Sequence, residues 1–369
     1  MPTLFKKAVP LTSDLGSTET LLTLEFLLHR LTSLLWSAPT STRLENLLAA
    51  LLHGPCVTYA SGLASLFAAY TFLKPHVVSI GFGYHGSHSV LSLYTRLTDA
   101  KVLSLDCPAE ELGQGDVIHL ETPVNPTGEA FEIRKFADKA HSRGAYLLVD
   151  STFGPPSLQD PFLWGADIIM HSGTKYLGGH SDMLLGVLAS KKDYWVQKLR
   201  EERTYLGSVP GSLESWLGVR SIRTLAIRVQ KQSKNAGEIV WRLDRLLHDP
   251  DEVAEADNIK AVKQCVAELH HASLQHGDES WLKTQMPNGY GPVFALTMVN
   301  ERLARKLPSK TKLFHHATSL GGVESLMEWR AMSDKTVDRR LVRLSIGIES
   351  ADDLVQDLLN AFRSLAEIE

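Results

Sequence analysis

The sequence predicts an α/β protein, with a mostly parallel sheet in a three-layer domain and a smaller α+β domain after it. Short runs of Val, Ile and Leu alternate along the chain with helical stretches, which is the pattern of β-α units and a parallel sheet. These apolar runs do not alternate with polar residues, which indicates strands that are buried on both faces.

We expect three parts in the 369 residues of the chain. Residues 1–43 mix Thr, Ser and Leu irregularly and are predicted to form an N-terminal arm. Residues 44–248 are predicted to form the large domain and residues 249–369 the small domain. The stretch "HDPDEVAEADN" marks the boundary between them, because it is acidic and contains Pro250.

The individual elements follow from local signals. A helix is predicted from Leu44 to Leu52, where a Gly-Pro pair soon stops it, and a second helix from Leu63 to Leu73. Strands of the large domain are predicted at "CVTYA", "HVVSI", "KVLSL", "VIHLE", "YLLVD", "DIIMH" and "LLGVLAS". The chain from Asp193 to His248 has a helical pattern. The small domain contains the strands "VFALTM", "LFHHA" and "VRLSI" and ends in a helix from Ala351 to Leu365.

The composition restricts the classes of partner. Lys and Arg number 38 against 42 Asp and Glu, a formal net charge of −4, which gives no sign of a basic surface for nucleic acid or for a membrane. No run approaches the ~20 apolar residues that span a membrane, and the N-terminus has no continuous apolar segment. The odd number of cysteines, Cys56, Cys107 and Cys265, excludes a fully paired disulfide framework. We therefore expect a cytoplasmic protein that binds small molecules.

The stretch "SIGFGYHG", residues 79–86, fits the pattern G-x-G-x-x-G. It follows an apolar run and precedes a plausible helix, and Asp106 ends a further apolar run twenty residues after Gly86. These features make up most of the fingerprint of a dinucleotide-binding turn. A dehydrogenase is therefore one hypothesis, but it gives no role to the residues described next.

A lysine follows the apolar strand in "IIMHSGTKYLGGHSD". Lys175 lies in a glycine-rich turn, and lysine is the side chain that forms a Schiff base with an aldehyde. The neighbouring hydroxyls of Ser172 and Thr174 would suit a phosphate. A surface lysine in a loop would show the same pattern. Ser172 and Lys175 also fit the S-x-x-K of serine β-lactamases, but the partner tripeptides K-T-G and S-D-N do not occur in the sequence.

Two further features complement the lysine. Asp150 ends the strand "YLLVD", and a buried carboxylate at that place needs a cationic partner, such as a protonated pyridine nitrogen. Ser61 and Gly62 lie between a strand and a helix, where free N–H groups can bind a phosphate. A loop-capping Asp and a simple Ser N-cap would each explain one of these features alone. Together with Lys175, they meet the requirements of pyridoxal phosphate.

Several ordered segments resemble one known family, the transsulfuration enzymes, which are fold-type I pyridoxal-phosphate enzymes of Cys/Met metabolism. The resemblance runs from about Pro39 to the C-terminus, through "YASGLAS", "GYHGSHSVL", "ETPVNPTG", "VDSTFGPP", "HSGTKYLGGHSD", "SWLGVRSIRTLAIR", "ATSLGGVESL" and "VRLSIGIESADDLVQDL". It implies the fold-type I architecture, with pyridoxal 5'-phosphate bound in residues 44–248. It also implies amino-acid substrates and a homo-oligomer, either a dimer or a tetramer built from dimers.

The resemblance implies roles for single residues. Lys175 would bind the aldehyde of the cofactor and then move protons, with Tyr84 stacked on the ring as a second catalytic residue. Asp150 would keep the pyridine nitrogen protonated. Further cofactor contacts are implied for Gly62, Leu63, Thr152, Ser172 and Thr174, and contacts to the substrate carboxylate for Asn125, Ser319 and Arg343. No metal is expected.

The expected reaction is γ-replacement on an activated homoserine, as in the cystathionine γ-synthases of the family. A β- or γ-lyase is the alternative, and a non-catalytic family member is a third hypothesis. The third rests on a departure: Ser33 and Leu35 stand where the family has a Tyr-x-Arg pair that reaches the neighbouring subunit's phosphate, with Arg30 or Arg43 as possible substitutes. In addition, Thr318 stands where γ-acting members often have Glu, and "MEWRAMSDK" replaces a Met-Thr-His segment.

Overall fold

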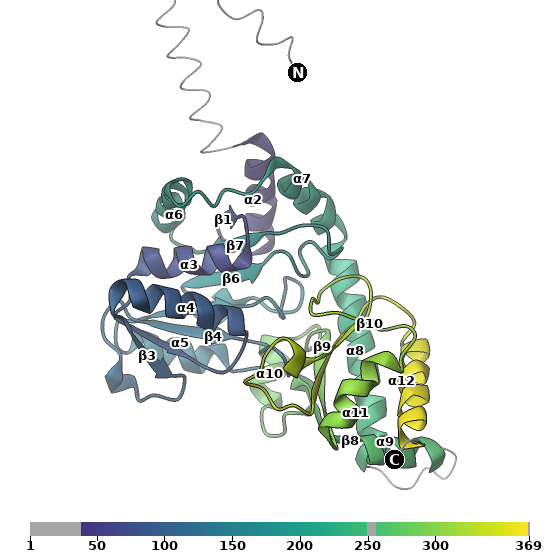
Figure 1. Cartoon of the computed structure of the whole chain (residues 1–369). Coiled ribbons are helices and arrows are strands. Elements are labelled where there is room, and N and C mark those ends of the chain that lie inside the picture. Colours follow the sequence, from purple (N-terminus) through teal and green to yellow (C-terminus); the bar gives the residue numbers. More distant parts are fainter. Residues whose placement is uncertain (1–37, 249–255, 368–369) are drawn as a thin grey trace, which may run out of the picture.

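The computed structural model describes residues 38–248 and 256–367 of the chain. Figure 1 shows a larger lobe and a smaller lobe, with helix α8 (Leu225–His248) running from one into the other. Of the predicted arm, only residues 38–43 are described, and most of them belong to helix α2 (Pro39–Leu51). Residues 249–255 of the predicted boundary lie outside the described residues, so the division into domains at residue 248 stays a prediction.

The larger lobe is built on a seven-stranded sheet with the order β1-β7-β6-β5-β4-β2-β3. Its strands are β1 (Cys56–Tyr59), β2 (Val77–Ile80), β3 (Lys101–Ser104), β4 (Val117–Glu121), β5 (Tyr146–Asp150), β6 (Ile168–Ser172) and β7 (Gly186–Ala189). Strand β7 is antiparallel to both β1 and β6, while the pairs from β6 through β3 are parallel. Six strands of this sheet therefore end at the same edge, as the prediction of a mostly parallel sheet requires.

Helices cover both faces of the large sheet and make three layers (Figure 1). One face packs against α3 (Gly62–Leu73), α4 (His85–Thr98) and α6 (Asp193–Tyr205). The other packs against α2 and α5 (Ile133–His141), with α7 (Ser212–Ser221) against α2. Because successive residues such as Leu147 and Leu148 are buried on opposite faces of the sheet, apolar and polar residues do not alternate along the strands. The α/β prediction is confirmed.

Strand β3 departs from the prediction that the apolar runs are buried on both faces. It is the edge strand of the sheet, and Val102 at its centre is 49% exposed. The run "KVLSL" has the same composition as its buried neighbours, so the sequence alone could not distinguish an edge position from a central one.

The smaller lobe contains a five-stranded sheet with the order β10-β11-β12-β9-β8. Its strands are β8 (Val266–His270), β9 (Val293–Met298), β10 (His315–His316), β11 (Leu326–Trp329) and β12 (Leu341–Ser345). The helices are α9 (Ala256–Cys265), α10 (Glu279–Gln285), α11 (Glu301–Lys306) and α12 (Ala351–Ala366). Strands β9, β10 and β12 were predicted, but β8 and β11 were not. The core of this lobe begins within α8, at Ala236.

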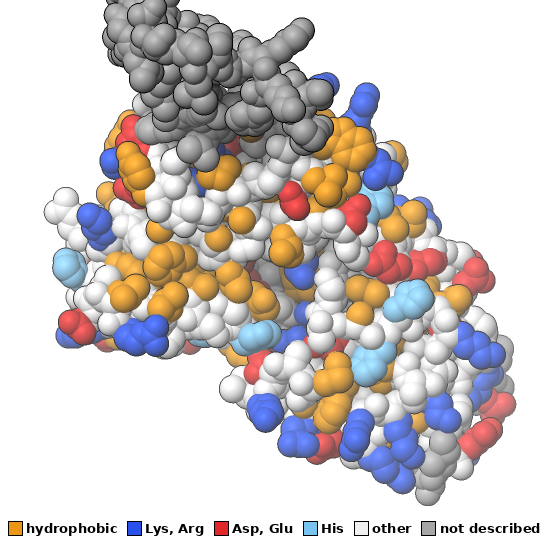
Figure 2. Space-filling view, turned by 45° about the horizontal axis from the view of Figure 1, so that its top comes forward, with side chains coloured by type: hydrophobic (Ala, Val, Ile, Leu, Met, Phe, Trp, Pro, Cys, Tyr) orange, Lys and Arg blue, Asp and Glu red, His pale blue; other side chains and the backbone are white. Residues whose placement is uncertain are grey.

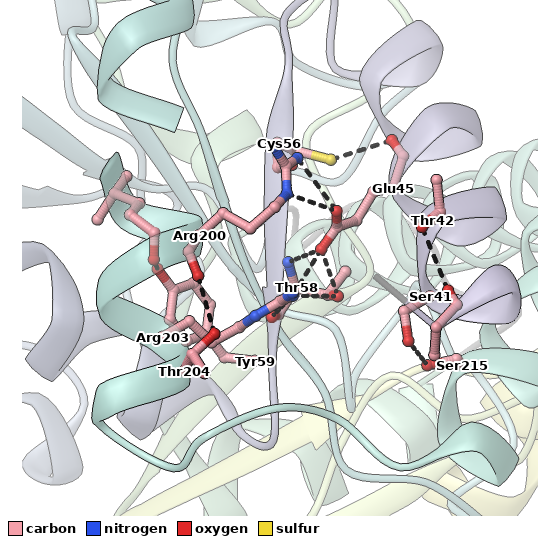
Figure 3. Close-up of polar contacts among 12 residues, drawn as sticks. Ser41, Thr42, Glu45, Cys56, Thr58, Tyr59, Arg200, Arg203, Thr204 and Ser215 are labelled. Carbon is pink, nitrogen blue, oxygen red and sulfur yellow. Dashed lines mark hydrogen bonds and ion pairs between the residues drawn. The ribbon is translucent and has the colours of Figure 1, made fainter. Parts of the chain in front are cut away.

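A buried cluster of charged and polar side chains connects α2 with β1 and α6 (Figure 3). Glu45 of α2 accepts hydrogen bonds at 3.0 Å from both the N–H and the hydroxyl of Thr58 on β1. Its two oxygens also pair with Arg203 at 2.7 Å and with Arg200 at 3.2 Å, both on α6. Arg203 is 1% exposed, so Glu45 provides a negative charge beside a buried cation.

No described helix is both long enough and apolar enough to span a membrane. Cys56, Cys107 and Cys265 are all free thiols.

Candidate active site

The loops after five strands meet at one edge of the large sheet. Since β1, β2, β4, β5 and β6 run in the same direction, the residues that follow them are brought together there. Loops of the smaller lobe close the far side and leave a cavity of about 490 Å³. In Figure 2 the surface is hollowed where the two lobes meet. The size is that of a site for a small organic ligand.

All of the predicted site residues line this cavity. They are Gly62, Leu63, Tyr84, Asn125, Asp150, Thr152, Ser172, Thr174, Lys175, Ser319 and Arg343. The sequence separates the first from the last by most of the chain, so the fold brings them to one place. Their individual roles remain predictions.

The N-terminus of α3 forms one end of the cavity. Ser61 caps the helix, with its hydroxyl accepting a hydrogen bond from the N–H of Ala64 at 3.1 Å. The N–H groups of Gly62 and Leu63 in the first turn have no partner within the helix and are available to an anion. A Cβ on Gly62 would lie 2.9 Å from the Cβ of Ser172, so only glycine lets the helix approach β6 this closely.

Asp150 ends β5 on the floor of the cavity. One of its oxygens accepts hydrogen bonds from the N–H of Thr152 at 2.9 Å and from its hydroxyl at 2.5 Å. No described residue donates a hydrogen bond to the other oxygen. Burial raises the pKa of Asp150, and burial together with the nearby Asp150 raises that of Glu121. A cation bound beside Asp150 would therefore be strongly favoured.

Lys175 follows β6 in a tight turn, where its N–H donates to the carbonyl of Ser172 at 3.1 Å. Its Nζ donates to the hydroxyl of Ser319 at 3.3 Å, across the cavity from the smaller lobe. Burial, reinforced by the positive charge of Arg343, lowers the pKa of Lys175 to about 8. A useful fraction of this amine is therefore neutral near physiological pH, which suits both attack on an aldehyde and proton transfer.

This lowered pKa makes a prediction about pH. Because only a neutral amine attacks an aldehyde, the rate at which cofactor-free protein captures pyridoxal phosphate should rise about tenfold per pH unit below the pKa. We expect it to level off above a pH of about 8, whereas N-acetyl-lysine, with an ordinary value near 10.5, keeps rising. Stopped-flow absorbance measures both rates. A protein rate that tracked the free amine would contradict the lowered pKa.

Arg343 lies on β12, a central strand of the small sheet rather than an edge, and is 3% exposed. Its guanidinium donates to the side-chain oxygen of Asn125 at 3.1 Å and to the carbonyl of Thr318 at 2.6 Å, and it pairs with Glu328 at 2.7 Å. Burial lowers the pKa of Arg343 to about 10, which leaves it charged at neutral pH. Together with Ser319, Arg343 and Asn125 form a side of the cavity that suits a carboxylate.

Glu121 links two predicted residues and was not itself singled out. Its carboxylate accepts hydrogen bonds from the N–H of Tyr84 at 2.8 Å and from the N–H of Asn125 at 2.7 Å. The sequence did contain a signal, because Glu121 opens the segment "ETPVNPTG". A Cβ on Gly83 would lie 2.4 Å from an oxygen of Glu121. A side chain at this glycine of the G-x-G-x-x-G pattern would therefore displace the carboxylate of Glu121, and Asp106 does not line the cavity.

The departures from the family pattern fall in different places. Ser33, Leu35 and Arg30 lie outside the described residues. Arg43 is described, but it lines a separate surface hollow beside Trp216. By contrast, the segment "MEWRAMSDK" contributes Arg330 and Ser333 to the cavity itself, two residues that sequence reasoning missed. His85, next to Tyr84, also lines it.

The donor set fits pyridoxal phosphate on chemical grounds. A helix N-terminus and two hydroxyl side chains, Ser172 and Thr174, would hold the phosphate. Asp150 offers a free oxygen to a protonated ring nitrogen, and Lys175 offers a partly neutral amine to the aldehyde. In addition, the hydroxyl of Thr152 accepts a hydrogen bond from the N–H of Ser172 at 2.9 Å, so the turn after β5 is connected to the end of β6.

Comparison with known proteins gives a consistent result. The sequence profile described as "Cys/Met metabolism PLP-dependent enzyme" matches residues 36–363. The chloroplastic cystathionine beta-lyase of Arabidopsis thaliana is 34% identical over 88% of this chain and 71% of its own length. A cystathionine gamma-synthase of Mycobacterium bovis is 34% identical over 88% and 84%. The crystal structure of metB from Corynebacterium glutamicum superposes with a TM-score of 0.80 at 28% identity, covering 90% of this chain and 86% of that one. The chain therefore belongs to the pyridoxal-phosphate-dependent enzymes of Cys/Met metabolism and has their fold-type I architecture.

Proposed function

We propose that the chain catalyses γ-replacement, in which an activated homoserine such as an O-acyl ester is joined at Cγ to cysteine or another nucleophile. The observation that carries the proposal is Lys175, with Nζ 3.3 Å from Ser319 in a cavity that also contains Asp150 and Arg343. The relatives named cystathionine gamma-synthase support replacement as the reaction type.

When bound, pyridoxal phosphate withdraws electrons from the Cα of an amino acid, so that the protons on Cα and then Cβ become removable. Asp150 supports this by holding a proton on the ring nitrogen. Arg343, Asn125 and Ser319 orient the substrate through its α-carboxylate. The planar guanidinium of Arg343 suits this task, because it can donate two parallel hydrogen bonds to one carboxylate.

Lys175 removes the proton from Cα, and its lowered pKa lets it both accept and return protons near neutral pH. Loss of a second proton from Cβ allows the acyl group to leave Cγ as a carboxylate. The thiol of the incoming cysteine then adds to Cγ, and protons return to Cβ and Cα. Tyr84, which lines the cavity, would lie against the cofactor ring and would assist proton transfer.

A substrate panel tests the proposal. Purified holoenzyme is incubated with O-acetylhomoserine, O-succinylhomoserine, cystathionine or methionine, with and without cysteine. The products are identified by mass spectrometry. We expect an ester and cysteine to give cystathionine at a rate that depends on cysteine. Release of ammonia and a keto acid at the same rate without cysteine would contradict replacement.

A β- or γ-lyase acting on cystathionine is the second candidate, and two observations favour the β-lyase. Thr318 lines the cavity where γ-acting members often have Glu, and one of the relatives is a cystathionine beta-lyase. Under this alternative, cystathionine alone releases ammonia and a keto acid. The keto acid identifies the bond that is cut, because β-elimination gives pyruvate and γ-elimination gives 2-oxobutyrate.

The expected assembly and location extend the proposal. We propose a homo-oligomer, either a dimer or a tetramer of dimers, which multi-angle light scattering of the full chain would measure. Location in the cytoplasm also remains a proposal from the sequence.

A further inference from the structure

Arg330 adds a second guanidinium group to the cavity wall. It begins the short helix η8 (Arg330–Met332), within the segment in which the sequence departs from the family pattern. The residue is 2% exposed and lines the cavity together with Ser333, Tyr84 and Arg343. Nothing in the proposed chemistry uses it, although a buried cation beside a reaction site is costly to maintain.

The hydrogen bonds of Arg330 leave one side of its guanidinium unused. Nη1 donates to Glu328 at 2.9 Å and to the hydroxyl of Ser333 at 3.1 Å. Nε is buried and has no hydrogen-bond partner among the described residues. Nη2 forms an ion pair with Asp334 at 3.7 Å, which is too long for a hydrogen bond. Nε and Nη2 form the edge that donates two parallel hydrogen bonds to a carboxylate or a phosphate.

The charges around Arg330 also leave it able to attract an anion. One oxygen of Glu328 is shared, since it lies 2.9 Å from Arg330 and 2.7 Å from Arg343. Glu328 therefore divides its negative charge between two guanidinium groups, and the second carboxylate that pairs with Arg330 is that of Asp334, 3.7 Å from Nη2. Asp334 is further away, and one of its oxygens is already hydrogen-bonded by the N–H and hydroxyl of Thr336 at 2.9 and 2.6 Å.

We infer that Arg330 recognises a second negative charge, at the far end of the substrate side chain. Arg343 and Arg330 are adjacent because both contact the same oxygen of Glu328. With Arg343 on the α-carboxylate, as the proposed function requires, Arg330 is left for an acidic γ-substituent. The preferred substrates are then amino acids whose side chain ends in a carboxylate or a phosphate, and neutral esters are poor substrates.

Ligand pairs of equal length test this inference without turnover. L-2-aminoadipate and L-norleucine have side chains of similar length that end in a carboxylate and a methyl group. Isothermal titration calorimetry of the holoenzyme should give a dissociation constant roughly 10- to 100-fold lower for aminoadipate, the range for hydrogen bonds to a charged group. L-2-amino-4-phosphonobutyrate measures the phosphate-like alternative in the same way.

Variants of Arg330 test whether this residue causes the preference for aminoadipate over norleucine. Arg330→Met should reduce the ratio of the two dissociation constants to near one, while Arg330→Lys, which keeps the charge but loses the planar fork, should retain part of it. Glu328 still pairs with Arg343 in both variants, so neither leaves it an unpaired buried charge. Arg340→Met is the matched control, because Arg340 is a nearby, half-exposed arginine that does not line the cavity.

The outcomes separate this inference from the proposed function. Equal binding of aminoadipate and norleucine by the wild type, or an unchanged ratio in Arg330→Met, would overturn the role of Arg330. If the ratio depends on Arg330 but no homoserine ester reacts, the inference about acidic side chains stands and γ-replacement fails. If neutral and acidic esters react equally well while the ratio still depends on Arg330, γ-replacement stands and the claimed substrate preference fails.

Discussion

The Lys175→Ala variant is expected to lose the long-wavelength absorption band of the bound cofactor and about 10³- to 10⁴-fold in turnover, the upper range for removal of a positioned acid-base group. The amine of this side chain donates a hydrogen bond to Ser319 at 3.3 Å, and its pKa is lowered to about 8 by burial. Absorbance spectra and steady-state rates of the substrate panel measure the two losses.

A matched lysine shows whether the effect is specific. Lys198 is half-exposed on α6, pairs with Glu201 at 3.3 Å and does not line the cavity, so Lys198→Ala should keep the wild-type spectrum and rate. Far-ultraviolet circular dichroism checks that both variants are folded. An unchanged absorption band in Lys175→Ala would refute the assignment of this lysine.

The Glu45→Ala variant is expected to lower the free energy of unfolding by about 3–5 kcal/mol, the cost of removing one member of a buried ion pair. The substitution removes the carboxylate that lies 2.7 Å from the guanidinium of Arg203, a side chain that is 1% exposed. It also removes the acceptor for two hydrogen bonds from Thr58. Chemical denaturation followed by circular dichroism measures the loss.

Glu238→Ala provides the comparison on a partly exposed pair. Glu238 pairs with Arg242 at 2.7 Å on α8, but both side chains are about one third exposed. Such pairs contribute roughly 0–1 kcal/mol, so this variant should remain close to wild type. Equal effects of Glu45→Ala and Glu238→Ala would show that the cluster in Figure 3 contributes no more than a surface pair.

Much of the site could be predicted from the sequence because its residues occupy defined positions on strands and helices. Asp150 ends a buried strand, Lys175 follows the next strand, and Ser61 caps a helix. In a sheet whose strands are parallel, those positions converge, so the fold class and the local pattern together predicted one cavity. The dinucleotide fingerprint passed the same local tests, but Gly83 lies beside the carboxylate of Glu121, which an added side chain would displace.

The remaining features depend on long-range contacts that leave no local signal. Arg330 reaches the cavity because β11 pairs with β12 and places its end beside Arg343. Strand β8 was missed because its exposed residues interrupt the apolar run, as at Glu268. The exposure of β3 depends on its place in the strand order, which no local pattern encodes.

The hydroxyl of Thr152 has a consequence for how much a bound cofactor can move. It donates to Asp150 at 2.5 Å and accepts from the N–H of Ser172 at 2.9 Å, so it joins the ends of two neighbouring strands. The carboxylate of Asp150 and the backbone of Ser172, a residue predicted to contact the phosphate, are thereby linked through one hydroxyl group. We therefore expect the site to select rigid aromatic ligands by length. A ligand that is one bond longer or shorter would contact either Asp150 or Ser172 well, but not both.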